Sequence, residues 1–206
     1  KADKIFYDKS KEILNIEGNV IITDPDGNLV ETSKAVYDKL NGKIKTYENT
    51  KLIFGDGYTV NTNNILYDTV EKIISSKKNT TLIDSDGNRV DVTMFQYLIK
   101  ENMFSSIGEI KIVDVNKNKY LFKELYVDTQ KKEMIGSDIS AAFNQESFGL
   151  SKKNDPRFVA NDIFISKNKS ILSKGVFTVC QKREGKCPPW SLRAKKILHD
   201  KVKKTI

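Results

Sequence analysis

The sequence holds very few of the residues that usually form catalytic or metal centres. Its 206 residues include one histidine, His199, and two cysteines, Cys180 and Cys187. A Ser-His-Asp or Cys-His arrangement would have to use His199, which lies in a lysine-rich tail and is best interpreted as a surface residue. A structural zinc site needs four ligands, whereas these residues supply three with unusual spacing. The sequence therefore predicts a protein that is not an enzyme and that uses no metal and no cofactor.

Other signatures of known chemistry are also missing. The sequence has no GxGxxG, Walker or HExxH motif, and each of those motifs holds a particular nucleotide or metal. The turns DPDGN and DSDGN lack the acidic residue that closes a calcium loop, so they are interpreted as turn formers. No apolar run approaches the ~18 residues of a membrane-spanning helix. The sequence offers no credible active site.

The charge of the chain is biased toward the positive sign. There are 35 Lys and Arg residues against 27 Asp and Glu residues, a net charge of +8. Such a balance suits a well-solvated surface, and it also suits an anionic partner such as an acidic lipid, a phosphorylated glycan or a nucleic acid. Binding to single-stranded nucleic acid would call for aromatic rings among basic residues. The recurring tyrosines are instead followed by aspartates, so no nucleic-acid partner is expected.

An internal repeat of thirty residues is the strongest positive signal. Tyrosines recur at this interval, and the first three are each followed by Asp: Tyr7, Tyr37, Tyr67 and Tyr97. Glycines preceded by Asp recur in the same register: Gly27, Gly57 and Gly87. Three apolar columns follow: Leu14, Ile44, Ile74, Phe104 and Met134; Ile22, Leu52, Leu82 and Ile112; Val30, Val60 and Val90. Several columns in one register indicate a repeat architecture.

Each repeat is predicted to form two strands joined by tight turns. Asp-Gly tolerates the positive φ that hairpin turns require, and it lies between runs rich in β-branched and aromatic residues. Helical periodicity is nearly absent, with residues 191–200 as the one candidate helix. The expected fold is all-β, a twisted antiparallel jelly roll of about eleven or twelve strands. A β-solenoid and a transmembrane barrel are weaker alternatives, because hairpin turns favour antiparallel pairing and charged residues occur on both strand faces.

The two cysteines allow two interpretations. Cys180 and Cys187 enclose a polar loop that contains Gly185 and is followed by two prolines. A loop of this size can close as a disulfide, which would persist in an oxidising compartment. The alternative is pairing with cysteines in another part of a longer chain. In either case we predict that both thiols are oxidised.

The repeat and the C-terminal segment together resemble a known family. The unit AVYDKLNGKIKTYENTKLIFGDG and the triplet Gly18-Asn19-Val20 resemble the OstA-like repeat. The segments DPRF (155–158), KGVFTVC (174–180) and CPPWSLRAKKILHDKVKKTI (187–206) are similar to the end of the N-terminal periplasmic domain of the LptD family of lipopolysaccharide-assembly proteins. The resemblance implies an OstA-like jelly roll over residues 1–180 and a connector over 181–206. That connector would lead to an outer-membrane barrel absent from this sequence.

The resemblance also implies a function. Family members receive lipopolysaccharide from an LptA-like bridge protein and pass it along a hydrophobic groove to the outer-membrane barrel, which is plugged by an LptE-like lipoprotein. The implied location is the periplasmic face of the outer membrane of a Gram-negative bacterium. Disulfides join this domain to the barrel in the family, but here both cysteines lie together near the end of the chain. A local Cys180–Cys187 bond is therefore also open.

Specific residues follow from this interpretation. Strand side chains alternate, and thirty is even, so the members of each apolar column should face the same way unless a bulge intervenes. The predicted inward-facing residues, which either pack a closed core or line a lipid groove, are Leu14, Ile22, Val30, Ile44, Leu52, Ile74, Leu82 and Ile112. The first strand, with Ile5 and Tyr7, is expected to be an open edge that receives the bridge protein by strand addition. Proline at either position is expected to weaken that docking.

Two other functions remain open at this point. One is a stand-alone bridge protein of the LptA or LptC kind, which would bind lipopolysaccharide without a barrel. The other is a structural β-repeat protein that carries no lipid, and failure to take up lipopolysaccharide would favour it.

Overall fold

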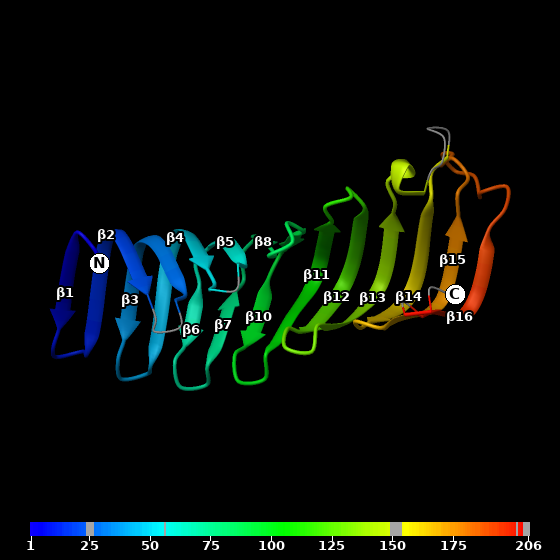
Figure 1. Cartoon of the computed structure of the whole chain (residues 1–206). Coiled ribbons are helices and arrows are strands. Elements are labelled where there is room, and N and C mark those ends of the chain that lie inside the picture. The colour runs from blue at the N-terminus through cyan, green and yellow to red at the C-terminus, as the bar shows by residue number, and fades with distance from the viewer. Residues whose placement is uncertain (24–26, 56, 149–153, 201, 204–206) are drawn as a thin grey trace. The chain divides into compact units, whose positions relative to one another are not determined.

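A computed structural model describes residues 1–23, 27–55, 57–148, 154–200 and 202–203. Its contacts divide the chain into an N-terminal unit, residues 1–106, and a C-terminal unit, residues 107–206. Within each unit the strands run as successive antiparallel hairpins (Figure 1). No helix in these ranges is long and apolar enough to cross a membrane. The domain boundary predicted after residue 180 stays a prediction.

The N-terminal unit contains ten complete strands in its described residues and the start of an eleventh. They are β1 (Lys4–Asp8), β2 (Ile13–Thr23), β3 (Leu29–Asp38), β4 (Lys43–Ile53), β5 (Thr59–Asn63), β6 (Leu66–Asp68), β7 (Ile73–Ser76), β8 (Thr80–Ile83), β9 (Arg89–Val92), β10 (Phe95–Leu98) and the first residues of β11 (Met103–Val113). The ladder divides at β4, which pairs with β5 over Asn49–Ile53 and with β6 over Lys43–Lys45. One branch continues through β8 and β9, and the other through β7, β10 and β11. Long strands thus pass from one sheet layer to another, as in a jelly roll.

The recurring aspartates close the turns at one end of the hairpins. The Asp38 carboxylate accepts hydrogen bonds from the backbone and the side-chain amide of Asn41 at 3.0 and 2.7 Å. Asp8 and Asp68 accept backbone N–H groups two and three residues later in the same way. These bonds favour the ionised form, so the side-chain hydrogen bond from Asn41 and then its backbone N–H lower the pKa of Asp38. The Asp that follows each tyrosine is therefore a turn residue.

Kinks interrupt the strands at the repeat interval. The backbone takes positive φ values inside strands at Gly18 (73°), Glu48 (61°), Gly108 (114°) and Asp138 (49°), positions spaced by thirty or sixty residues. A β-carbon at Gly18 would lie 2.3 Å from a carboxylate oxygen of Asp3, so a larger residue there would have to displace the Asp3 side chain, and the φ of 73° also favours glycine. The register shifts at the same point, between Glu17 and Val20. Each kink bends a strand from one layer to the other.

Buried hydroxyl groups satisfy the backbone at the kinks of the N-terminal unit. Thr50 donates to Thr46 across the kink at Glu48, at 2.8 Å, and also contacts Thr32 at 3.1 Å. Thr62 and Thr80 repeat the arrangement, with their hydroxyl oxygens 2.8 Å apart in a hydrogen bond. These hydroxyls also donate to carbonyls near the kinks, such as Thr80 to the carbonyl of Lys78 at 2.8 Å. No buried side-chain polar atom among the described residues lacks a partner, which removes the cost of burying them.

The C-terminal unit continues the hairpins. After the remainder of β11 come β12 (Lys119–Asp128), β13 (Glu133–Ala142), a short 3-10 turn (Gln145–Phe148), β14 (Arg157–Ile165), β15 (Lys169–Thr178) and β16 (Leu192–Asp200). From β12 to β16 each strand pairs antiparallel with the next. Among the described residues of this unit, the buried apolar side chains include Ile110, Phe122, Leu125, Ile139, Ala141, Pro156, Ala160 and Ile163.

The structure confirms the all-β antiparallel jelly roll and corrects two details. Sixteen strands occur in the described residues, against the predicted eleven or twelve. Kinks divide three long strands into the pairs β5 and β6, β7 and β8, and β9 and β10. The candidate helix over 191–200 does not form, because residues 192–200 of this segment form β16. This segment pairs with β15 at eight register positions. If it were a helix, the edge of β15 would lose these ladder hydrogen bonds.

Candidate functional site

The predicted apolar columns form two continuous rows in the N-terminal unit. Directly opposed residues of an antiparallel ladder have their side chains on the same face. The first row, in strand order, is Ile22, Val30, Leu52, Val60, Leu82 and Val90. The second row is Tyr7, Leu14, Tyr37, Ile44, Tyr67, Ile74, Tyr97 and Phe104. Each row therefore offers one unbroken apolar line across several strands.

Both rows lie on the inner face of the strands. Leu52 is two residues from buried Thr50 and Val60 is two residues from buried Thr62, so each shares the face of that threonine. Leu52 and Val60 are themselves buried. The other predicted lining residues are partly exposed: Leu14, Ile22, Val30, Ile44, Ile74, Leu82 and Ile112. Ile112 lies in the part of β11 that belongs to the C-terminal unit. Whether these side chains contact lipid stays a prediction.

β1 is an edge strand in the described structure. It pairs with β2 and with no other described strand. Ile5 is 64% exposed and Tyr7 42%, and they lie opposite Ile16 and Leu14 on the inner face. Phe6 points to the other face and is 66% exposed. The thirty-residue pattern did not indicate this residue. The edge thus presents apolar side chains on both faces.

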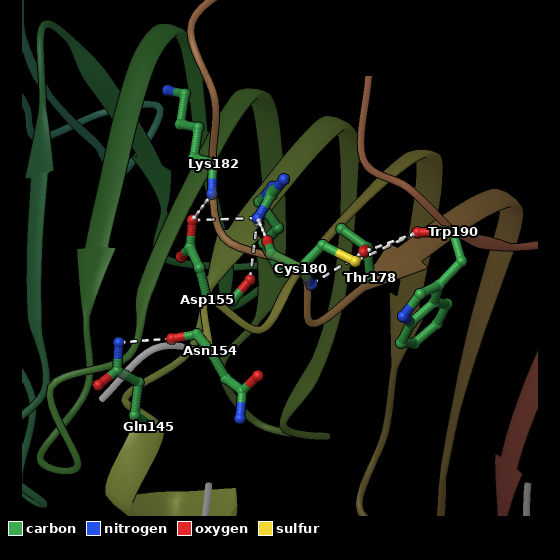
Figure 2. A network of polar contacts seen from close by, with 8 residues as sticks. Gln145, Asn154, Asp155, Thr178, Cys180, Lys182 and Trp190 are labelled. Atoms are coloured by element: carbon green, nitrogen blue, oxygen red, sulfur yellow. Dashed lines mark hydrogen bonds and ion pairs between the residues drawn. The ribbon is translucent and has the colours of Figure 1, made fainter. Parts of the chain in front are cut away.

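The DPRF segment holds the chain that follows β15 (Figure 2). Arg157 donates from Nη1 to the Asp155 carboxylate at 3.0 Å and also to the carbonyl of Cys180. The backbone N–H of Lys182 reaches the same Asp155 oxygen at 3.2 Å. Thr178, the last residue of β15, donates to the carbonyl of Trp190 at 2.9 Å, which connects the end of β15 to the segment just before β16. The DPRF motif therefore has a structural role.

Cys180 and Cys187 are free thiols in the structure, Cys180 partly exposed and Cys187 exposed. A hydrogen bond with the side chain of Thr178 is the largest contribution that lowers the pKa of Cys180 below its ordinary value. A lowered pKa favours the thiolate, which is the form that attacks disulfides. The disulfide itself stays a prediction.

No group of three or more His, Cys, Asp or Glu residues that could hold a metal occurs in the described ranges.

A groove lined mainly by residues with polar side chains crosses the strands of the N-terminal unit. It has a volume of about 770 Å³. Its lining residues are Asn19, Val20, Ile21, Glu31, Thr32, Ser33, Asn49, Thr50, Lys51, Asn61, Thr62, Asn63 and Asn79. Sequence reasoning missed this groove, although Asn19, Asn49 and Asn79 follow the thirty-residue interval and could have indicated it. No aromatic residue is among those that line it.

Comparisons with known proteins give limited information. No family model matches the chain, and no curated protein matches it. Among solved structures, LptH, described as the LptA homologous periplasmic component of the lipopolysaccharide transport device from Pseudomonas aeruginosa, is 14% identical, with a TM-score of 0.27 over 65% of this chain and 77% of that one. The TCP10 domain of Danio rerio CPAP, in complex with a STIL peptide, is 14% identical, with a TM-score of 0.15 over 85% and 99%. Neither likeness is close enough to carry an argument about what this chain does.

Proposed function

We propose that this chain carries lipopolysaccharide through the periplasm of a Gram-negative bacterium, as the periplasmic domain of an LptD-like outer-membrane assembly protein. The observation that carries the proposal is the pair of apolar rows on the inner face of the N-terminal unit. A carrier of acyl chains needs a long apolar path that is reachable from outside. Six of the eight predicted lining residues are partly exposed within that unit, among them Ile22, Ile44 and Leu82.

The dimensions of the rows suit an extended hydrocarbon chain. Adjacent strands are about 4.8 Å apart, so the six residues of the first row extend over about 24 Å. Burial of each methylene contributes about 0.8 kcal/mol. Several acyl chains can therefore bind firmly without any directional polar contact. The energy barrier to movement along the path is also low, because an acyl chain that moves by one strand exchanges one apolar neighbour for another.

Site-specific photocrosslinking in cells tests this function. A photoreactive amino acid at Ile44 or Ile74 should crosslink to lipopolysaccharide. The matched control is Leu66, which is also apolar and 40% exposed but pairs with Lys45, next to Ile44, and so faces the other side of the sheet. Equal crosslinking from Leu66 and Ile44 would contradict an inner lipid path. Absence of lipopolysaccharide crosslinks at every row position would favour a structural β-repeat protein.

Docking of a bridge protein on β1 is the second part of the proposal, and the register determines how to test it. Asp3 donates its N–H to the carbonyl of Gly18 at 2.9 Å. Because N–H directions alternate along a strand, the N–H groups of Ile5 and Tyr7 also point to β2. The groups that point away from β2 belong to Lys4, Phe6 and Asp8. Proline at Ile5 or Tyr7 would therefore damage the protein's own ladder, which corrects the choice of position made from the sequence.

The informative substitution is Phe6→Pro, which removes an N–H that faces away from β2. It should weaken crosslinking to an LptA-like partner at this edge while the circular dichroism spectrum stays unchanged. Phe6→Ala is the control, because it removes the same ring and keeps the N–H. If Phe6→Pro crosslinks to the partner as well as Phe6→Ala does, backbone pairing at β1 is not the docking mode.

A further inference from the structure

The side of the C-terminal unit that faces away from its buried residues carries a continuous apolar row. Ile135 lies next to buried Gly136, and Phe164 lies next to buried Ile163, so both point to the opposite face of their strands. Directly opposed residues of the ladder share a face. We call this side of β12–β16 the outer face. In strand order its first row is Tyr126, Ile135, Phe164, Ile171 and Leu198.

Much of this row is open to solvent. Tyr126 is 39% exposed, Ile135 54% and Leu198 49%, and five strands extend over about 19 Å. A second row crosses the same face, with Leu121 43% and Val159 49% exposed. Two such rows on one face are uncommon in soluble monomers, where exposed apolar residues are mostly scattered. In strand order the second row is Leu121, Ser140, Val159, Val176 and Arg193.

The repeat does not require an apolar residue in the first row. At intervals of thirty residues before Ile135, the same position is taken by Asn15, Lys45, Ser75 and Ser105. Each of these directly follows a member of the inner apolar column, so it also points away from the inner face. The hairpins therefore accept a polar residue here, and the fold itself does not explain Ile135.

The last hairpin brings positive charge to this apolar face. Residues 169–200, from the start of β15 to the end of β16, contain eight Lys or Arg against two acids, a net charge of +6. The ammonium of Lys169 lies 5.9 Å from the centroid of the Phe164 ring in the first row. Lys196 is two residues from Leu198 and so shares its face, and Arg193 belongs to the second row.

These cations are not neutralised within the described structure. Arg193, Lys195 and Lys196 are exposed, and none of them forms an ion pair with a described acid. Glu124 and Asp162, acids of the same face, lie on β12 and β14, whereas the bases lie on β15 and β16. The β16 end of the outer face is therefore basic.

Apolar rows bordered by cations fit one kind of partner best. A second copy of the chain would bring two segments of +6 together, and like charges across an interface repel. A nucleic acid would use the cations but not the exposed aliphatic side chains. An anionic bilayer uses both, since apolar side chains enter the boundary between headgroups and acyl chains while basic side chains reach the lipid phosphates. Tyrosine, as at Tyr126, is enriched at that boundary.

We propose that the outer face of β12–β16 docks on the surface of an anionic phospholipid bilayer. The apolar rows contact the boundary between headgroups and acyl chains, and the bases of β15 and β16 contact phosphates. This goes beyond the proposed function, because it concerns where the chain is held and not what it carries. It is also independent of that function, since it involves only strands of the C-terminal unit.

Co-sedimentation with lipid vesicles tests the docking. The whole chain should bind vesicles that contain phosphatidylglycerol, and it should bind vesicles of pure phosphatidylcholine about tenfold more weakly or less. Higher salt should weaken the binding without abolishing it, because screening acts on the lysine–phosphate attraction and not on the apolar contacts. Equal binding to both kinds of vesicle, or binding to neither, would overturn the proposal.

The basic end of the face is tested by the double variant Lys195→Gln and Lys196→Gln. Loss of two charges near an anionic surface should weaken binding to phosphatidylglycerol vesicles by about tenfold or more. Lys77→Gln with Lys78→Gln is the matched control, because it removes the same charge from exposed positions of the N-terminal unit and should leave binding nearly unchanged. Equal weakening in the two double variants would mean that net charge alone governs binding, and the outer face would be refuted.

The apolar row has a variant of its own. Ile135→Ser introduces the residue that earlier repeats hold at Ser75 and Ser105, so the circular dichroism spectrum should stay unchanged. Binding to phosphatidylglycerol vesicles should weaken by about fivefold, since less apolar surface leaves water. Leu40→Ser, in a turn of the N-terminal unit where Leu40 is 73% exposed, should bind as the wild type does. Wild-type binding by Ile135→Ser would contradict contact between the row and the bilayer.

Two further readouts separate this proposal from its neighbours. If sedimentation equilibrium finds dimers that Ile135→Ser dissociates, and vesicles are not bound, the outer face binds a second copy and bilayer docking is refuted. Crosslinking of lipopolysaccharide at Ile44 reports on the carrier function separately. A chain that crosslinks there but ignores phosphatidylglycerol vesicles retains the carrier function and loses the docking face. Vesicle binding that depends on Lys195 and Lys196, without crosslinking at Ile44, supports the docking face and refutes the carrier function.

Discussion

The two units both bury apolar side chains, but they differ in how many hydroxyl residues they bury beside them. In the described N-terminal unit, seven buried residues are serine or threonine: Thr32, Thr46, Thr50, Thr62, Ser76, Thr80 and Ser106. In the described C-terminal unit the buried hydroxyl residues are Ser170 and Thr178. At the kink that follows Gly108, the position occupied by Thr50 and Thr80 in earlier repeats is taken by Ile110, which is 0% exposed. Val20, 1% exposed, takes this position in the first repeat, so the slot holds a hydrogen-bonded threonine in the second and third repeats and a packed apolar side chain in the first and fourth.

The charges of the two units differ as well. Residues 1–106 contain 14 Lys and Arg against 16 Asp and Glu, a net charge of −2. Residues 107–206 contain 21 against 11, a net charge of +10. The positive balance of the whole chain therefore belongs to the C-terminal unit, and it includes Lys195 and Lys196 on β16. The net charge of the whole chain, +8, does not reveal this difference between the units.

The comparison shows that a repeat can keep its geometry while its chemistry changes. Hydroxyl groups fix the kinks through directional bonds, and they leave less apolar surface to drive folding. Ile110 and Phe122, which stand thirty and sixty residues after Thr80 and Thr62, bury more apolar surface at those places. We therefore expect the C-terminal unit to be more sensitive to lost volume and the N-terminal unit to be more sensitive to lost hydrogen bonds.

The largest effect is expected from loss of core volume in the C-terminal unit. Ile139 on β13 is 2% exposed. Ile139→Ala should lower the free energy of unfolding by about 2–5 kcal/mol, measured by urea denaturation. Ile135→Ala is the matched control, since Ile135 lies on the same strand and is 54% exposed. Similar losses in the two variants would show that the apolar interior is not the main source of stability.

A disulfide between Cys180 and Cys187 should give the next largest effect. Closure of this short loop would stabilise the protein by about 2–3 kcal/mol in the chain-entropy description. Non-reducing mass spectrometry with thiol blocking should find neither thiol free in protein from the periplasm. Cys187→Ser should then unfold at lower urea concentration than the oxidised wild type and at the same concentration as the reduced wild type. Ready alkylation of both thiols in native protein would refute the bond.

The hydroxyl ladder of the N-terminal unit is tested by Thr62→Val. This nearly isosteric change removes a hydroxyl that contacts Ser76 at 3.1 Å and Thr80 at 2.8 Å. Because the partners remain buried, the free energy of unfolding should fall by about 1–3 kcal/mol. Thr23→Val, at an exposed position of β2, should change it little. A neutral Thr62→Val variant would mean that the kinks do not depend on these bonds.

The sequence was sufficient for those features that depend on local chemistry. Asp-Gly turns, alternation and the Tyr-Asp column predicted antiparallel hairpins, and the thirty-residue spacing predicted one shared face for residues such as Leu52 and Leu82, which lie in the same ladder row. Turn residues act through their own φ preferences and short-range hydrogen bonds. This is why a single sequence reveals them.

Features that depend on neighbouring strands were not visible. Glu48 has no intrinsic preference for positive φ, and it adopts 61° where its N–H donates to the side-chain oxygen of Asn64, sixteen residues away. The segment 191–200 forms a strand because β15 offers it a partner edge. The asparagines that line the groove escaped notice because exposed polar residues are common and the β4–β5 register is what places Asn49 opposite Asn63. In each case tertiary pairing decides the outcome.

The smallest predicted effect is a pH dependence within the C-terminal unit. Burial is the largest of the effects that raise the pKa of Tyr120 from its ordinary value of 10.0 to about 12, and the Asp114 carboxylate, 3.1 Å from its hydroxyl, adds to the shift. Because the folded-state pKa is raised, the folded protein retains this proton where the unfolded chain loses it. The contribution to stability is therefore complete below pH 10 and is lost as the pH rises through about 12. Ultraviolet titration should show a late tyrosinate step that Tyr120→Phe abolishes, and Asp114→Asn should move that step to lower pH. If the step is unchanged in Tyr120→Phe, Tyr120 is not the late-titrating residue, and the C-terminal interior does not exclude charge at this position.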